Sequence, residues 1–152
     1  MLKEAILAYL HFAAIFTLVW FLAKEWTLLR AGPEAIDFRR LSLADAGYGL
    51  SSLAVLATGL ARFFIGAKPA VFYLHNPVFY VKIGLFVLVG LASIAPTIRI
   101  ARWRRAAAEN AAFRPDMASW RGVRRWVMIE AHILALIPLA AVLMSRAIGY
   151  IP

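Results

Sequence analysis

The sequence contains no cysteine among its 152 residues. This absence excludes disulfide bonds, thiol catalysis, cysteine-ligated zinc, iron–sulfur clusters and a C-x-x-C-H haem attachment. Charged residues are also scarce, at 16% of the chain, and only 8 residues are acidic. A soluble domain of ordinary composition carries about 25% charged residues. The chain is therefore too poor in charge to be a disordered segment, a coiled coil or a nucleic-acid-binding module.

Apolar residues are abundant instead, at 63% of the chain, with a mean hydropathy of +0.75. A helix that crosses a bilayer needs about 20 mainly apolar residues. Four stretches qualify, at residues 5–22, 46–65, 77–98 and 126–144, and the first can extend to residue 29. The sequence predicts one all-α domain, an integral membrane protein built as an antiparallel four-helix bundle.

The basic residues predict how the chain is oriented in the membrane. Of the 17 Lys and Arg residues, twelve lie at residues 23–45 or 99–125, in or beside the first and third connectors. Cytoplasmic loops carry the excess of Lys and Arg, so both termini are expected to be periplasmic in a bacterial inner membrane. The net charge of +9 is interpreted as anchoring to anionic headgroups, with no nucleic acid as a partner. The Ala-rich stretch near residue 106 allows a short helix on the membrane surface.

Ionisable residues at membrane depth are the candidates for function, because they are costly there and normally face the bundle interior. His11 lies roughly 9 Å inside the outer boundary, where it can ligate a metal or haem iron, carry protons or hydrogen-bond another helix. Lys82 is expected at the same level, and Arg62 approaches it from the second span. Three cationic groups repel unless an anion lies among them, which a haem with two propionates would supply. The alternative is that Lys82 and Arg62 extend to the outer surface.

The fourth span offers a second histidine, at a different depth. His132 is expected about 12 Å from the level of His11, so a haem held between the two is disfavoured. Glu130 faces away from His132, which is expected to pack or hydrogen-bond. Glu25 shares a face with His11, and with Lys24 it is expected to mark the water interface.

One face of the second span is rich in small and polar residues. Their helical spacing places them in a single stripe: Tyr48, Ser52, Val55, Gly59 and Arg62. Such a stripe serves close helix packing, and it would also let a flat macrocycle lie against the helix. Tyr48 is therefore a candidate for cofactor binding together with His11, Arg62 and Lys82.

Short motifs carry a resemblance to known families. The segments "YLHFAAIFTLVWF" and "NPVFYVKIGLF" resemble the membrane-embedded, haem-containing protoporphyrinogen oxidases of bacteria, the HemJ type. The whole chain is similar to an uncharacterised family of short four-span proteins grouped with CopD-like copper-resistance domains. The resemblance implies haem b, with His11 as the axial metal ligand and Lys82 as a second essential group. Tyr80 stands where the HemJ type usually has a histidine.

Three functions follow as expectations. The first is a haem b-binding redox protein that oxidises a lipophilic substrate such as a porphyrinogen or a quinol, with Lys82 as a catalytic acid or base. The second is a copper-handling membrane protein that binds the metal through His11, His75 and methionines. The third is a non-catalytic bundle that stabilises a larger complex or forms a homo-oligomer. The second axial ligand and the substrate are left open.

Overall fold

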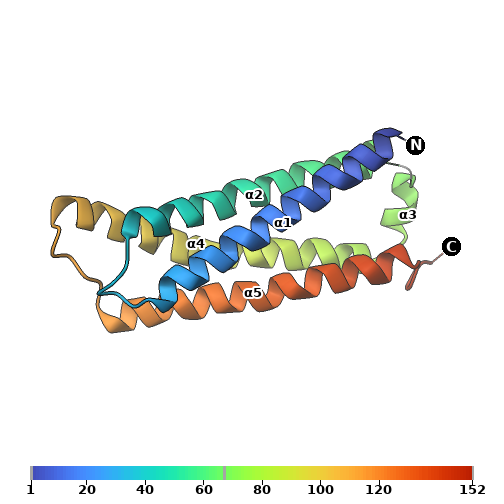
Figure 1. Ribbon diagram of the computed structural model, residues 1–152. Helices are drawn as coiled ribbons and strands as arrows, with labels where there is room; N and C mark the ends of the chain where they lie inside the picture. The colour runs from blue at the N-terminus through green and yellow to red at the C-terminus, as the bar shows by residue number, and fades with distance from the viewer. Residues whose placement is uncertain (1, 67, 152) are drawn as a thin grey trace.

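A computed structural model describes residues 2–66 and 68–151. Four long helices run along one another to form an elongated bundle (Figure 1). They are α1 (Leu2–Arg30), α2 (Phe38–Ile65), α4 (Pro77–Glu109) and α5 (Met117–Ser145), and a short helix, α3 (Ala70–Leu74), links α2 to α4. Each long helix is long and apolar enough to cross a membrane. The all-α four-helix fold predicted from the sequence is confirmed.

The long helices pack in a ring: α1 contacts α2, α2 contacts α4, α4 contacts α5, and α5 contacts α1. Both termini and α3 lie at one end of the bundle, which we call the terminus end (Figure 1). The connectors at residues 31–37 and 110–116 lie at the other end, the connector end (Figure 1). Neighbouring helices in the chain are therefore antiparallel.

Every apolar span lies inside one helix, but the helices continue beyond the spans at the connector end. Helix α1 reaches Arg30, and α4 continues past residue 98 to Glu109. The expectation of a separate surface helix near residue 106 was wrong, because that stretch belongs to α4. Alanine and arginine are strong helix formers, and α4 contains no proline after Pro96 to end it earlier.

Polar caps determine where three of the helices begin. The Asp37 carboxylate accepts hydrogen bonds from the backbone N–H groups of Arg39 (2.9 Å) and Arg40 (3.1 Å) at the start of α2. The Asn76 side chain caps α4, directly before a proline at its first position. The Asp116 carboxylate accepts from the Ser119 N–H (2.8 Å) in α5. Each cap satisfies N–H groups that have no partner within the helix.

The apolar core is concentrated in the connector half of the bundle. Its centre is a stacked pair of indoles, Trp103 and Trp120, with ring centroids 5.4 Å apart. In the terminus half the packing is sparser: no residue of α2 beyond Ser51 is buried, and the buried residues of α4 begin at Val89. The same chain thus has a close-packed half and a loosely packed half.

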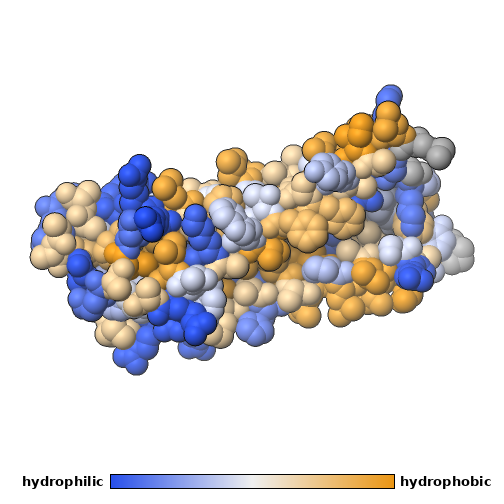
Figure 2. All heavy atoms as spheres, in the orientation of Figure 1, coloured by the Kyte–Doolittle hydropathy of each residue, from blue (hydrophilic) through white to orange (hydrophobic). Residues whose placement is uncertain are grey.

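Apolar side chains cover the outside of the bundle. Figure 2 shows them over the middle and the terminus end of the visible face, whereas hydrophilic residues gather toward the connector end. Phe16 and Leu50, each 71% exposed, are typical of this belt. Soluble monomers rarely expose contiguous apolar surface on this scale. The belt is the surface that faces lipid.

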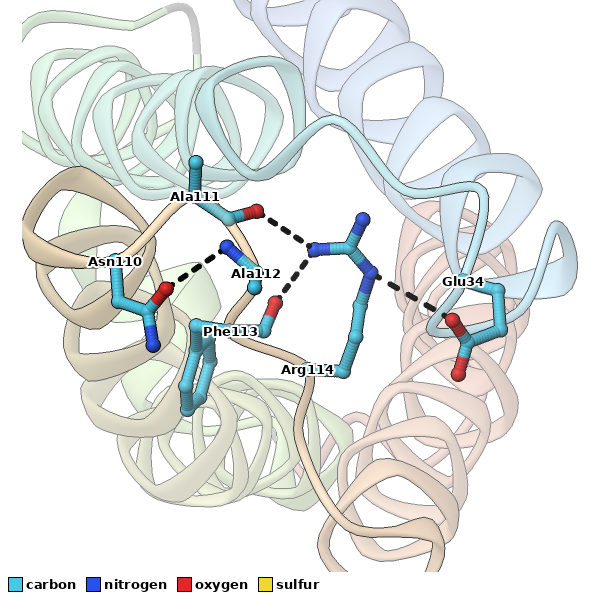
Figure 3. A network of polar contacts seen from close by, with 6 residues as sticks. All are labelled: Glu34, Asn110, Ala111, Ala112, Phe113 and Arg114. Carbon is cyan, nitrogen blue, oxygen red and sulfur yellow. Dashed lines mark hydrogen bonds and ion pairs between the residues drawn. The ribbon is translucent and has the colours of Figure 1, made fainter.

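The two connectors are joined by one arginine (Figure 3). The Arg114 Nη1 donates to the carbonyls of Phe113 (2.6 Å) and Ala111 (3.2 Å), and its Nε lies 3.7 Å from Glu34 Oε2. Arg114 follows α4, and Glu34 follows α1. The contact therefore connects the α1–α2 hairpin to the α4–α5 hairpin.

Candidate functional site

His11 lies on the side of α1 that packs against α2, and it is only 7% exposed. Its Nδ1 is 2.8 Å from Thr58 Oγ1. The Thr58 hydroxyl has one hydrogen, which the carbonyls of Ala54 (2.7 Å) and Val55 (3.2 Å) are placed to accept. In this arrangement the hydroxyl oxygen accepts from the His11 Nδ1–H. In the neutral imidazole this leaves the lone pair on Nε2, the nitrogen that can bind a metal.

Gly59 lies beside the imidazole on α2. A Cβ atom at this position would lie 3.4 Å from His11 Cε1, which is an ordinary van der Waals contact. The imidazole therefore packs closely on this part of α2. Thr58 orients it through the hydrogen bond, and Thr58 is the partner that the sequence did not single out.

Arg62 and Lys82 lie near His11, as predicted. Both are close enough to act on the imidazole electrostatically, and they act on each other. Arg62 Nη2 is 3.7 Å from Glu4 Oε1, and its buried Nε makes no hydrogen bond to any described residue. The ion pairs of the described residues give Lys82 no carboxylate partner. We call His11, Arg62, Lys82 and Glu4 the His11 cluster, and it carries more cationic groups than carboxylates.

Glu4 is a member of this cluster that sequence reasoning missed. It precedes His11 by seven residues, which is two helical turns, so both side chains fall on the same face of α1. That spacing is the signal that could have found it.

The structure does not bring Tyr48 to the His11 cluster. Tyr48 precedes Thr58 by ten residues, which is about 15 Å along α2. Its side chain is 3% exposed and lies beside Glu130 of α5, in the connector half.

The other two histidines lie on the surface. His75 Nδ1 is 3.0 Å from the carbonyl of Val71, and His132 Nδ1 is 2.7 Å from the carbonyl of Met128. In both cases the carbonyl belongs to the residue four positions earlier in the chain. His132 thus makes a hydrogen bond, as expected, and it takes no part in the His11 cluster. Among the described residues, no group of three or more His, Cys, Asp or Glu side chains is arranged to hold a metal ion.

A second group of polar side chains lies inside the connector half. Glu25 is 2% exposed and Glu130 is 1% exposed. The expectation that Glu25 marks the water interface was wrong. Helix α1 continues beyond Glu25, whose side chain falls on the same inward stripe as Leu22 and Leu29.

Two open pockets lie outside both groups. The first, of about 620 Å³, is at the connector end and is lined by Arg99, Arg102, Trp103, Ala106, Phe113, Ala118 and Ser119. The second, of about 420 Å³, is lined by residues of α1 between Trp20 and Leu28. None of the predicted site residues lines either pocket.

Four membrane-length helices, an apolar outer belt and ionisable side chains turned inward define a multi-pass membrane protein. Residues 3–149 match the family described as "Predicted membrane protein (DUF2214)", and the chain belongs to that family. No curated protein and no solved structure matches the chain.

Proposed function

We propose that the chain binds haem b in the terminus half of the bundle and exchanges single electrons with a lipophilic donor such as a quinol or a porphyrinogen. His11 holds the iron through Nε2. The observation that carries the proposal is a buried imidazole whose Nδ1 already has a partner and which lies near two cationic side chains.

The donor chemistry of His11 fits a haem ligand. Histidines that bind metals usually donate their other ring N–H to a fixed partner, which orients the ring. Thr58 has this role here, at 2.8 Å from Nδ1. A single histidine is a sufficient protein ligand for haem iron.

The charges of the His11 cluster fit the two carboxylates of haem b. Among the described residues, the ion pairs give Arg62 and Lys82 only Glu4 as a carboxylate partner, and the Arg62 Nε is buried without a hydrogen bond. Like charges repel strongly where water is excluded. Propionates would balance them and accept charge-assisted hydrogen bonds.

The packing of the terminus half also supports the proposal. Protein interiors are normally filled to crystal-like density. Here α2 contributes no buried residue beyond Ser51, and α4 contributes none before Val89. Three aromatic rings already pack between these helices at the terminus end, since Phe63 lies 5.6 Å from both Phe79 and Tyr73. A flat macrocycle beside His11 would add to this packing.

Each residue of the proposed site has its own role. Haem b supplies one-electron chemistry when bound. His11, which packs beside Gly59 of α2, would hold the iron. Arg62 orients a carboxylate, and Lys82, half-buried and without a carboxylate partner among the described residues, transfers a proton to or from the donor.

The proposal is tested by titrating haem b into the purified protein in mild detergent. We expect a Soret band that saturates for the wild type and is lost in His11→Ala. The surface variants His75→Ala and His132→Ala are matched controls and should retain it. A wild type without the band refutes haem binding and leaves the non-catalytic bundle. A His11→Ala protein that keeps the band refutes His11 as the iron ligand.

The cationic residues are tested with a second ligand, the dimethyl ester of haem b, which lacks the carboxylates. Arg62→Gln and Lys82→Gln should each weaken haem b about tenfold or more, since a charged hydrogen bond is worth about 1.5–3 kcal/mol. Both variants should bind the ester as the wild type does. Equal losses for both ligands would show that these residues do not hold the propionates.

We further propose that the terminus end, and with it the haem, faces the periplasm, because the basic connectors favour the cytoplasm. The cysteine-free sequence makes the test direct. In intact cells, a membrane-impermeant maleimide should label Lys3→Cys but not Ala111→Cys. The opposite pattern would reverse the orientation without affecting the haem site.

A further inference from the structure

Four polar side chains from three helices meet inside the connector half. They are Glu25 of α1, Asp45 and Tyr48 of α2, and Glu130 of α5, and we call them the carboxyl cluster. Each acts electrostatically on others of the group. Asp45 is half-exposed, whereas the other three side chains are almost completely buried.

Among the described residues, no ion pair joins a cationic side chain to the carboxyl cluster. The ion pairs join Arg40 to Asp37, Arg62 to Glu4 and Arg114 to Glu34, so all three lie outside it. Helix α4 packs on α2, and its Thr97 Oγ1 donates to Asp45 Oδ1 at 2.7 Å, whereas its Arg104 Nη1 bonds Ser42 Oγ at 3.4 Å, one helical turn before Asp45. Keeping three carboxylates ionised at this depth would cost a prohibitive amount of free energy, because the charges are removed from water.

Two buried atoms of the carboxyl cluster are poorly satisfied. The Tyr48 hydroxyl and Glu130 Oε1 make no hydrogen bond of good geometry to a described residue. The two side chains lie close enough to interact with each other, and this contact is the only one that the described residues offer these two atoms. Buried polar atoms without partners are rare in folded proteins, and each needs an explanation.

We propose that the carboxyl cluster is a proton-binding site that exchanges with water at the connector end. Asp45 is the exchange group, because it is half-exposed and directly precedes the apolar stretch that starts at residue 46. A proton from water binds to the Asp45 carboxylate and passes to Glu25 or Glu130; release follows the same path in reverse. No electron moves and no other bond changes. Transmembrane carboxyl groups commonly serve such proton relays.

Larger ligands fit the carboxyl cluster less well. The described residues contain no set of three carboxylate or histidine groups with the geometry for a metal ion. The buried apolar side chains of Leu22, Val127 and Leu41 belong to the core on the same three helices, which favours a ligand as small as a proton.

The test is infrared spectroscopy of the full-length protein in lipid nanodiscs near neutral pH. A protonated carboxyl group absorbs apart from carboxylates and shifts when hydrogen is replaced by deuterium. We expect this band in the wild type, and its partial or complete loss in Glu25→Gln or Glu130→Gln. Glu34→Gln and Glu109→Gln, which remove exposed carboxylates, should leave it unchanged.

Glutamine has the shape of a protonated glutamic acid, so Glu130→Gln should fold and unfold thermally as the wild type does. The absence of a protonated-carboxyl band, or a band that survives in both buried variants, would overturn the proposal. Stabilisation by sodium or potassium chloride, but not by choline chloride, would identify a bound metal cation instead and would also overturn it. The proposal requires no haem, so its outcome is independent of the titration above.

Discussion

The hydrogen bond between Thr58 and His11 is the contact whose removal is most informative. Thr58→Val keeps the shape of the side chain and removes the hydroxyl. It deletes the hydrogen bond from the hydroxyl to the Ala54 carbonyl (2.7 Å), which is shared with the Val55 carbonyl (3.2 Å), and the bond from His11 Nδ1 (2.8 Å). The imidazole N–H is then left in the bundle interior without its acceptor.

A second threonine isolates the contribution of His11. Thr17 donates to the Ala13 carbonyl at 2.8 Å, and its side chain is exposed on the outside of α1. Thr17→Val therefore removes the helix-internal bond alone. Hydrogen bonds between membrane helices are worth about 0.6 kcal/mol on average, and a buried group left unpaired costs about 1–3 kcal/mol. We expect Thr58→Val to lower the free energy of unfolding by about 1–2 kcal/mol more than Thr17→Val.

The same pair of variants separates stability from ligand binding. Equilibrium unfolding in mixed micelles measures stability, and haem titration measures ligand binding. Because partners of ligand histidines typically change metal affinity by about 10–100-fold, Thr58→Val should weaken haem binding by that factor. Thr17→Val should leave the affinity for haem unchanged. If the two variants behave alike in both assays, Thr58 does not orient the imidazole.

Two further predictions concern the packing of the bundle. Trp120→Ala removes a buried partner of the stacked indole pair and should lower the free energy of unfolding by about 3–5 kcal/mol. Trp126 is 41% exposed, so Trp126→Ala should lower it much less. Equal losses in the two variants would place the core elsewhere. Gly47→Ala should destabilise the α1–α2 pair, because its Cβ would overlap the Phe21 ring. Gly49→Ala meets no atom within 4 Å and should stabilise α2 by up to about 1 kcal/mol, so a gain in both variants would contradict the close approach at position 47.

Two properties of a residue decide how well the sequence predicts the site: its depth in the membrane and the face of the helix on which it lies. Depth along each span placed His11 and Lys82 together correctly, because both lie a few residues from the same boundary. The shared face of Tyr48 and Arg62 was misleading. Their stripe extends over 14 residues, or about 21 Å, so residues on one face can belong to different sites.

Hydropathy locates the apolar parts of the helices but not their ends or their partners. The polar continuation of α4 to Glu109 has no membrane signal and depends on helix propensity and on the core around Trp103. Glu25 is buried because α5 packs against the same part of α1, a tertiary contact that no local pattern shows. For this reason the carboxyl cluster becomes visible only in the folded chain.

The absorption spectrum of the protein purified from the membranes of the expressing cells, without added haem, tests the central claim most directly. The account predicts a haem b spectrum in the wild type and in His132→Ala, and its absence in an equally folded His11→Ala protein. A colourless wild type from haem-replete cells, or a His11→Ala protein with the same pigment, would contradict it.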